Sequence, residues 1–405
     1  MVYFCRMQKS KSSQFEFIAL MASLMAIVAL AIDALLPALD IIGKDIGTTS
    51  LSDNQLLITM IFLGLGVGSL IFGPLSDSLG RKPIVYLGLG LFVMASIICI
   101  YAEDLNTMVF GRILQGIALS APRTVSIAII RDSYEGDYMA RIMSFVTVIF
   151  LLIPIVAPAF GKFILDLYNW ETIFYVQIVF ALLAGIWFYK RQEETLNKPN
   201  RIRFTPSLFV EGTKELIKFK TTIGYTLISG FITGSFMVYL STSQQVFELQ
   251  YGLSEEFPYI FAGLAISVGL ATFLNGTWVL KFGMRRLVNW AMIGFLGISL
   301  LYVIIFFGKQ NPPIEVVLTF FGLQFFAIGF LFGNLRSLAM QPVGHIAGIA
   351  AAITGFISTM MAVPISALIG MFVIDSVMPL FIGFFIFSLI SIGILFYLGT
   401  FKKPA

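Results

Sequence analysis

The chain has 405 residues, of which 58% are hydrophobic and only 12% are charged, and its mean hydropathy is +0.93. Because a soluble globular protein carries about 25% charged residues, this composition excludes an ordinary soluble fold and indicates a protein whose solvent is a lipid bilayer. The formal net charge of +4 gives no reason to expect a nucleic-acid partner.

The residue types that hold metals or act as nucleophiles are scarce. Cys5 and Cys99 lie far apart and His345 is the single histidine, so we expect no disulfide frame, no metal site, no cofactor and no enzymatic activity. His345 falls between two apolar segments, where a turn residue is expected rather than a proton relay. The pair Gly161–Lys162 lacks the Ser or Thr that completes a phosphate-binding loop, so ATP-driven pumping is not expected.

Hydropathy divides the chain into apolar segments long enough to cross a bilayer, which takes roughly 20 residues. They are predicted at 17–39, 55–76, 83–101, 106–130, 141–165, 170–189, 222–247, 257–280, 285–307, 313–338, 346–374 and 376–399. The first is too long for a signal peptide and lacks a small-residue cleavage site, so it is expected to be a retained span. The predicted fold is an all-α membrane protein with twelve transmembrane helices.

Lysine and arginine positions predict how these segments are oriented. With both termini placed in the cytoplasm, 21 of the 26 Lys and Arg residues fall on the cytoplasmic side and three on the other side. The other two, Arg112 and Arg123, lie within the fourth segment. Because Lys and Arg favour the cytoplasmic side, the distribution predicts cytoplasmic termini and supports the count of twelve spans.

A polar stretch separates the first six segments from the last six. The expected organisation is a cytoplasmic tail (1–16), an N-terminal six-helix bundle (17–189), a linker (190–221), a C-terminal six-helix bundle (222–399) and a cytoplasmic tail (400–405). Within the linker, apolar residues recur near helical spacing among Glu and Lys. Two interpretations stay open: an amphipathic helix on the inner leaflet and a solvated tether.

The two halves carry equivalent marks. Glycines seven residues apart end the second segment (Gly73–Gly80) and the eighth (Gly276–Gly283), and bases follow both pairs at an offset of about 203 residues. Pro158 and Pro364 stand in the fifth and eleventh segments. These marks indicate two six-helix bundles related by pseudo-symmetry about an axis along the membrane normal.

Several motifs resemble those of a known family. Gly73–Pro83, which reads Gly-Pro-Leu-Ser-Asp-Ser-Leu-Gly-Arg-Lys-Pro, resembles the loop 2–3 signature of the major facilitator superfamily. Leu105–Gly116 resembles its span 4 signature. Ala157–Gly161 is similar to its span 5 antiporter signature, but that signature has glycine before the proline and a second glycine where Lys162 stands.

Further motifs point to a subgroup. Ile32–Leu39 resembles the span 1 motif of drug/proton antiporters, and Arg131–Tyr134 and Pro342–Gly348 resemble the bicyclomycin-resistance (Bcr/CflA) group. The resemblance implies a proton-coupled secondary transporter that exports a small molecule from a central cavity across the bacterial inner membrane, with the proton gradient as its energy source. Its partners would be that molecule and the bilayer, and we expect a monomer.

Two other functions stay open. A proton symporter or facilitator that imports a nutrient or metabolite is the main alternative, because the antiporter motif is imperfect. A membrane sensor that transports nothing is a third, and it would not need a buried acid such as Asp33.

Asp33 and Arg112 are the residues expected to carry proton coupling. From the rise per residue of an α-helix, we expect Asp33 to lie about 10 Å and Arg112 about 12 Å below the same outer face of the membrane. An ionisable group at such depth is costly and marks a functional site. The hypothesis is that Asp33 carries the proton and Arg112 tunes it, since desolvation and a nearby cation act on a carboxylate in opposite directions. A fixed ion pair between spans 1 and 4 is the alternative.

Arg123 lies on nearly the same helical face as Arg112, with Gln115 at its border. This stripe is predicted to line the central cavity, with Arg123 and Gln115 contacting the substrate; for Arg123, snorkelling toward the inner headgroups is equally open. If both arginines face the cavity, their two positive charges exceed the single negative charge of Asp33. The expected substrate is therefore amphipathic and neutral, zwitterionic or anionic.

Span 7 places aromatic and hydroxyl side chains on one face, which suits either a mostly apolar ligand pocket or helix packing. The candidates for substrate contact are Tyr225, Phe236, Tyr239 and Ser243, with Ser229 beside them and Gln324 of span 10 as a weaker candidate.

The loop 2–3 stretch is expected to act as a latch at the inner gate, because in the resembled family its acid pairs with bases and with the positive end of a helix. Arg81 and Lys82 also serve the membrane orientation. The predicted gating residues are Gly73, Asp77, Gly80, Arg81, Lys82, Arg131, Arg141, Pro158 and Gly161.

Overall fold

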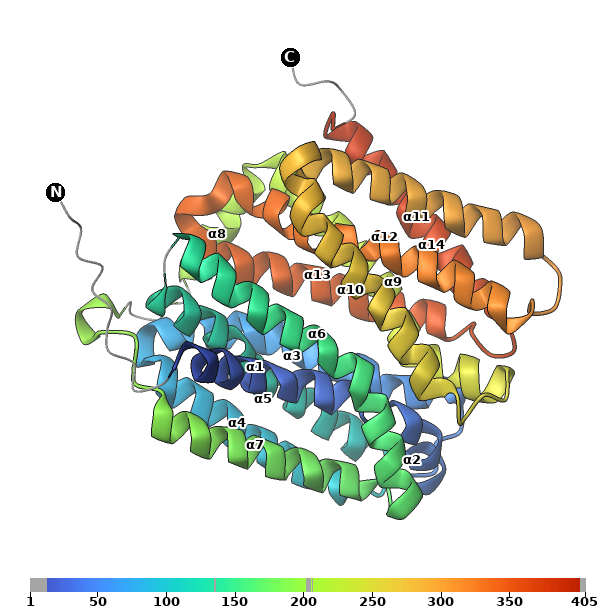
Figure 1. Ribbon diagram of the computed structural model, residues 1–405, viewed down its shortest axis with the longest axis horizontal. Coiled ribbons are helices and arrows are strands. Elements are labelled where there is room, and N and C mark those ends of the chain that lie inside the picture. The colour runs from blue at the N-terminus through green and yellow to red at the C-terminus, as the bar shows by residue number, and fades with distance from the viewer. Residues whose placement is uncertain (1–12, 135, 202–204, 206, 401–405) are drawn as a thin grey trace.

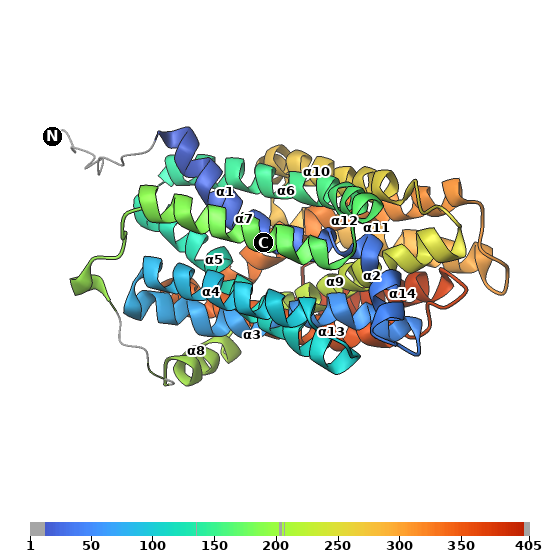
Figure 2. The ribbon, with the colours of Figure 1, turned by 90° about the horizontal axis from the view of Figure 1, so that it is seen from below.

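The computed structural model describes residues 13–134, 136–201, 205 and 207–400. Its long helices run side by side in two groups that lie one above the other in Figure 1. The first group, α1 to α7, is drawn from blue to green, and the second, α9 to α14, from yellow to red (Figures 1 and 2). Most of each tail (1–12 and 401–405) lies outside the described residues.

The first half contains seven α-helices and one short 3₁₀ turn among the described residues. They are α1 (Gln14–Asp33), η1 (Leu36–Ala38), α2 (Leu39–Asp45), α3 (Leu51–Leu79), α4 (Arg81–Ile100), α5 (Leu105–Ser133), α6 (Gly136–Leu167) and α7 (Glu171–Arg191).

The linker and the second half follow. They comprise η2 (Lys198–Asn200), α8 (Ser207–Ile217), α9 (Lys220–Gln244), η3 (Gln245–Gln250), α10 (Phe257–Phe282), α11 (Met284–Phe306), α12 (Ile314–Met340), η4 (Gln341–Ile346), α13 (Ala347–Gly370) and α14 (Met378–Tyr397).

The prediction of an all-α membrane protein is confirmed. Eleven helices within the described residues are long and apolar enough to cross a membrane, and α6 covers the remaining predicted span, 141–165. Helices are the expected form because every backbone N–H and C=O in lipid must find its partner inside the protein, and an α-helix satisfies them within one segment.

The first span, predicted at 17–39, is divided in the structure. The helix α1 ends at Asp33, and the chain passes through η1 before it resumes as α2. Pro37 lies in this break. A helix does not readily continue through proline, because proline has no N–H to donate and its ring clashes with the preceding helical turn. The break leaves Asp33 as the last residue of α1.

The linker helix α8 packs against the second half. A Cβ on Gly212 would lie 3.0 Å from the side chain of Ile349 of α13. Leu216 is buried in a small apolar cluster together with Val343, Ala350 and Ile353. The linker therefore contains a helix with an apolar face seated on one end of α13.

The turn between α3 and α4 has a counterpart between α10 and α11. Gly80 has a φ of +110° and Gly283 a φ of +79°, a backbone region that favours glycine. Each glycine ends one helix and begins the next. The position equivalent to Asp77 is occupied by Leu280, whose side chain is 90% exposed. The backbone turn is therefore repeated in the second half, but the acidic side chain of Asp77 is not.

Close packing of small residues joins α3 to α5. A Cβ added to Gly116 would lie 2.0 Å from the carbonyl oxygen of Ile61, and one added to Gly64 would lie 2.1 Å from that of Ile113. These two backbones therefore approach as closely as glycine allows, which is how helices associate when lipid supplies no hydrophobic driving force.

Gly116→Ala is expected to destabilise the protein, because a backbone carbonyl cannot yield to the added methyl group. Overpacking of this kind costs about 1–3 kcal/mol. The matched control is Gly90→Ala in α4, where a Cβ meets nothing within 4 Å and the better helix propensity of alanine is the remaining effect. Thermal unfolding in detergent should show a lower midpoint for Gly116→Ala alone; equal midpoints for the two variants would contradict the packing argument.

Candidate functional site

A cavity of about 650 Å³ lies between the two halves. Its wall comes from α3 and α5 of the first half, with Arg81 of α4, and from α9, α12, η4 and α13 of the second. We call the end of the bundle that carries the Gly80 turn the turn end, and the opposite end the far end. The cavity reaches the turn end, because Asp77, Arg131 and Met340, all near helix termini there, belong to its wall.

At the far end, amide hydrogen bonds hold the halves together. The Nε2 of Gln55 in α3 donates to Oε1 of Gln245 at 2.9 Å and to the carbonyl oxygen of Gly370 at 3.1 Å. Gln245 in turn donates to the carbonyl oxygen of Val373. Gln55 is buried, and these contacts leave no space for a Cβ on Gly370. The structure is therefore closed at the far end and open at the turn end.

An ion pair adds to this closure. Lys162 of α6 lies 2.8 Å from Asp166 on its own helix and 3.2 Å from Glu255, which precedes α10 in the second half. Lys162 is one of the two residues that depart from the span 5 antiporter signature. Its position shows a use for the departure: a side chain long enough to reach the other half.

Arg112 is fully buried and ties three helices together. Its Nε donates to the carbonyl oxygen of Leu57 in α3 at 2.7 Å, and Nη2 donates to that of Ala31 in α1 at 3.1 Å. Nη1 donates to Oε1 of Gln115, whose Nε2 donates to the hydroxyl of Ser96 in α4. Ala31 is among the last four residues of α1, whose carbonyls have no partner inside the helix.

Asp33 is buried, with 4% of its surface exposed, and it forms no ion pair with Arg112. The alternative of a fixed Asp33–Arg112 bridge is therefore wrong for this structure. Arg112 instead uses backbone carbonyls, because the end of α1 presents them at the same depth. In the other half, the hydroxyl of Tyr239 is buried and has no hydrogen-bond partner among the described residues.

The antiporter-like motif packs directly behind Asp33. A Cβ on Gly161 of α6 would lie 2.0 Å from the carbonyl oxygen of Ala34. Pro158, one turn earlier in α6, is buried as well. Since Ala34 follows Asp33 at the break of α1, any shift of α6 is transmitted to the backbone that carries the acid.

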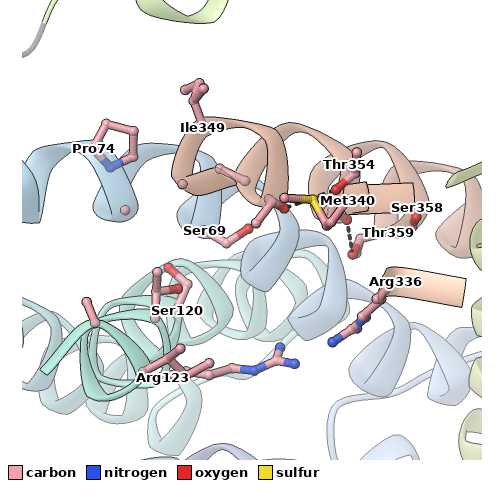
Figure 3. Close-up of a pocket in the computed structure, with 18 of the residues that line it drawn as sticks. Ser69, Pro74, Ser120, Arg123, Arg336, Met340, Ile349, Thr354, Ser358 and Thr359 are labelled. Carbon is pink, nitrogen blue, oxygen red and sulfur yellow. Dashed lines mark hydrogen bonds between the residues drawn. The ribbon is translucent and has the colours of Figure 1, made fainter. Parts of the chain in front are cut away.

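Arg123 lies in the cavity wall, and Gln115 does not. Gln115 is fully buried in the Arg112 network. A second arginine, Arg336 of α12, also lines the cavity and points toward Arg123 (Figure 3). Arg336 is one of the 21 Lys and Arg residues counted on the cytoplasmic side, yet it falls inside the predicted span 313–338. A base within an apolar span is itself a signal of function.

Besides Gln115, five further side chains predicted to contact the substrate are not part of the cavity wall: Tyr225, Phe236, Tyr239, Ser243 and Gln324. Phe236 and Tyr239 belong to an aromatic cluster of the second half, where the rings of Tyr239 and Phe325 lie 4.5 Å apart. Ser243 donates to a carbonyl of its own helix, and Gln324 to one of α11.

The cavity face of α9 is instead made by Thr226, Ser229 and Thr233. On a helical wheel this face is centred about 70° away from Tyr225. The physical reason is that the large rings pack against neighbouring helices of their own half, where they bury more area, while the small hydroxyl side chains face the space that is not filled. Of the predicted span 7 face, Ser229 is the member that reaches the cavity.

At the turn end, Arg81 is the centre of a charged cluster. Its side chain is 3% exposed; Nη1 lies 2.6 Å from Asp77, and Nε lies 2.8 Å from Asp132 at the end of α5. Nη1 also donates to the hydroxyl of Ser76. The cluster joins α3, α4 and α5 of the first half. Asp132 lies in the Arg131–Tyr134 motif but was not predicted to pair with Arg81, because the sequence alone does not show that the end of α5 meets the turn.

The start of the linker is fastened to the same turn. The carboxylate of Glu194 accepts from the backbone N–H groups of Arg81 at 3.0 Å and Lys82 at 3.1 Å. Lys82 Nζ donates to the carbonyl oxygen of Gln192 at 2.6 Å. Arg131, one of the predicted gating residues, lines the cavity, and the side chain of Arg141, another of them, lies outside the described residues.

This arrangement matches a known family. The profile of the Major Facilitator Superfamily matches residues 21–367 of the chain. The chain belongs to this superfamily. A curated relative, the uncharacterized MFS-type transporter YdgK of Bacillus subtilis, is 31% identical over 95% of this chain and 96% of its own length. A bicyclomycin resistance protein homolog of Haemophilus influenzae is 27% identical over 91% of this chain and 92% of its own.

A solved structure gives the same fold. The D-xylose-proton symporter superposes with a TM-score of 0.74 at 14% identity and covers 97% of this chain and 98% of that one. The protein is therefore a multi-pass membrane transporter of small molecules, not an enzyme, built as two six-helix bundles of the Major Facilitator type. Within the described residues, no group of three or more His, Cys, Asp or Glu side chains is placed to hold a metal ion.

Glu194→Gln is expected to loosen the attachment of the linker to this transporter's loop 2–3 turn. The carboxylate accepts two N–H groups at the start of α4 and faces the positive end of that helix, contacts together worth about 1–2 kcal/mol. Hydrogen exchange at the amides of Arg81 and Lys82 should speed up about five- to thirtyfold. Glu211→Gln on the exposed face of α8 is the control; unchanged exchange in Glu194→Gln would contradict the attachment.

Proposed function

We propose that this protein is a proton-coupled antiporter that exports a small molecule by alternating access, and that Asp33 carries the proton. The observation that carries the proposal is the state of Asp33: a carboxylate buried between the halves with no ion pair and no hydrogen bond to another described residue.

An enclosed carboxylate without a cation is more stable with its proton bound, because water no longer solvates the charge. Opening of the far end would hydrate Asp33 and favour the charged form. The protonation of Asp33 is thereby linked to which end is open, and that linkage is what coupling requires. The Gly161–Ala34 contact supports this role, since it joins the acid to α6, a helix that meets the second half.

The distribution of Lys and Arg supports an orientation in which the turn end faces the cytoplasm of a bacterial cell and both termini lie on that side. The protein then sits in the inner membrane with its cavity open inward. In this state the exporter takes up its substrate. Arg112 holds the end of α1 in place in this scheme, and the Arg81 cluster keeps the first-half helices together at the cytoplasmic gate.

The relative named for bicyclomycin resistance supports export over import. A proton symporter that brings a nutrient inward is the alternative, and a sensor that moves nothing is the third candidate. The exported molecule is expected to be amphipathic and neutral, zwitterionic or anionic, and the transporter is expected to work as a monomer without a cofactor.

Asp33→Asn is expected to abolish proton movement coupled to transport while leaving the fold intact, because an amide of the same shape cannot exchange a proton. The measurement is the interior pH of proteoliposomes, followed with a trapped dye, after addition of compounds from a resistance panel that begins with bicyclomycin. The matched control is Asp40→Asn; Asp40 lies on α2 and pairs with Lys44 at 2.6 Å. Proton flux at the wild-type level in Asp33→Asn would contradict the assignment of Asp33 as the proton carrier.

The same assay separates the alternatives. Protons and compound moving in opposite directions support antiport. Movement in the same direction would establish symport and overturn export. A protein that shifts neither protons nor any compound would indicate a sensor.

A further inference from the structure

Two arginines face each other across the cavity. Arg123 extends from α5 of the first half and Arg336 from α12 of the second, and Figure 3 shows their guanidinium groups pointing toward one another. Like charges that face each other across one cavity repel. No hydrogen bond or ion pair joins either side chain to another described residue, and both keep exposed surface inside the cavity.

The acids near the cavity do not neutralise this pair. Asp77 is the acidic residue of the cavity wall, and its carboxylate lies 2.6 Å from Arg81. Asp132 is bound to the same arginine at 2.8 Å. The turn cluster thus uses the carboxylates, and four arginines against one aspartate line the cavity. The local field favours an anion.

Guanidinium groups have a chemistry that selects among anions. Each presents several N–H donors in a planar fork that matches the paired oxygens of a carboxylate, sulfonate or phosphate. Two forks from opposite sides can hold one oxyanion between them, and that anion would remove the repulsion of the two cations. Neither a neutral ligand nor a cation would do so.

The rest of the wall indicates what the oxyanion is attached to. Hydroxyl groups of Ser229 and Thr233 lie on one side, and Phe62 and Leu65 supply apolar surface on the other. A volume of about 650 Å³ suits a molecule of drug size. The pocket therefore fits an apolar body with hydroxyl-bonding groups and one anionic head.

We propose that Arg123 and Arg336 form a clamp for the oxyanion group of an amphipathic organic anion, and that this anion is the class of molecule the transporter moves. The clamp rests on the proposed transport function and narrows its substrate to one class. Because its two members belong to opposite halves, a bound anion draws the halves together at the turn end.

The test is equilibrium binding to the full-length protein in phosphatidylcholine nanodiscs, with three probes of one size: naphthalenesulfonate, naphthalenesulfonamide and naphthyltrimethylammonium. Naphthalenesulfonate should bind most tightly. Arg123→Gln and Arg336→Gln should each weaken it about ten- to hundredfold, the loss of one charge-assisted contact, and leave sulfonamide binding unchanged. The Arg→Lys variants should lie between, because the charge stays and the fork is lost.

Arg286→Gln is the matched control, since Arg286 is exposed at the start of α11 and outside the cavity wall. Sulfonamide binding shows that each variant is folded. Sulfonate binding that survives both Gln substitutions, or tightest binding of the cation, would overturn the clamp.

A lipid phosphate shares the chemistry of a free organic anion, so a second set of nanodiscs contains phosphatidylglycerol. If this lipid weakens sulfonate binding to the wild type but not to the Gln variants, the clamp stands and its occupant is a lipid headgroup. If binding is unchanged, the occupant is a free anion.

The assay uses no proton gradient, so the two proposals fail separately. Anion binding through both arginines without coupled proton flux would overturn the antiporter proposal and leave the clamp. Proton-coupled transport without arginine-dependent anion binding would overturn the clamp alone.

Discussion

The buried charge of Arg112 is the constraint on which the first half depends. A guanidinium taken out of water needs several hydrogen bonds to offset its lost hydration, and here the acceptors are carbonyls of Leu57 and Ala31 and the amide of Gln115. These acceptors come from α1, α3 and α5, so the helices cannot move apart without stranding the charge. Asp33 lies two residues beyond Ala31, and its position follows from the same contact.

The two ends of the molecule are held by different chemistry. At the turn end, the Arg81 cluster joins helices of one half, while at the far end neutral amides of Gln55 and Gln245 bridge the halves. A neutral hydrogen bond contributes about 1 kcal/mol. A few such bonds give a closure of a few kcal/mol, which is the range that binding of a proton or a ligand can shift. The packing of α3 against α13 and of α6 against α10 adds to these bonds between the halves.

Much of the fold could be predicted from the sequence because lipid imposes a strong rule on it. Apolar length predicted the twelve spans, and Gly80 and Gly283 marked equivalent turns. Contacts made by the backbone could not be predicted: Arg112 was paired with Asp33 because carbonyl oxygens carry no sequence signal. Arg112 does lie against the end of α1 that carries Asp33, but its acceptor there is the carbonyl oxygen of Ala31 in the last turn of that helix.

The candidate site was harder to predict because a helical wheel does not show which face is empty. On α9 the aromatic face around Tyr239 looked like a pocket, and the hydroxyl face of Thr226 and Thr233 proved to line the cavity. Arg336 was predicted to serve orientation. Its partner across the cavity lies more than 200 residues earlier in the chain, so only the assembled halves bring the two charges together.

The asymmetry of the repeat explains why the cavity is basic. In the first half, Asp77 of the turn and Asp132 both pair with Arg81. In the second half, the equivalent position is the exposed Leu280. No carboxylate of the described cavity wall is left for Arg123 and Arg336. Their repulsion acts between the halves and favours separation at the turn end when no anion is bound. On the proposed clamp, a bound anion would neutralise this repulsion and favour closure at the turn end, so the two charges would distinguish a loaded transporter from an unloaded one.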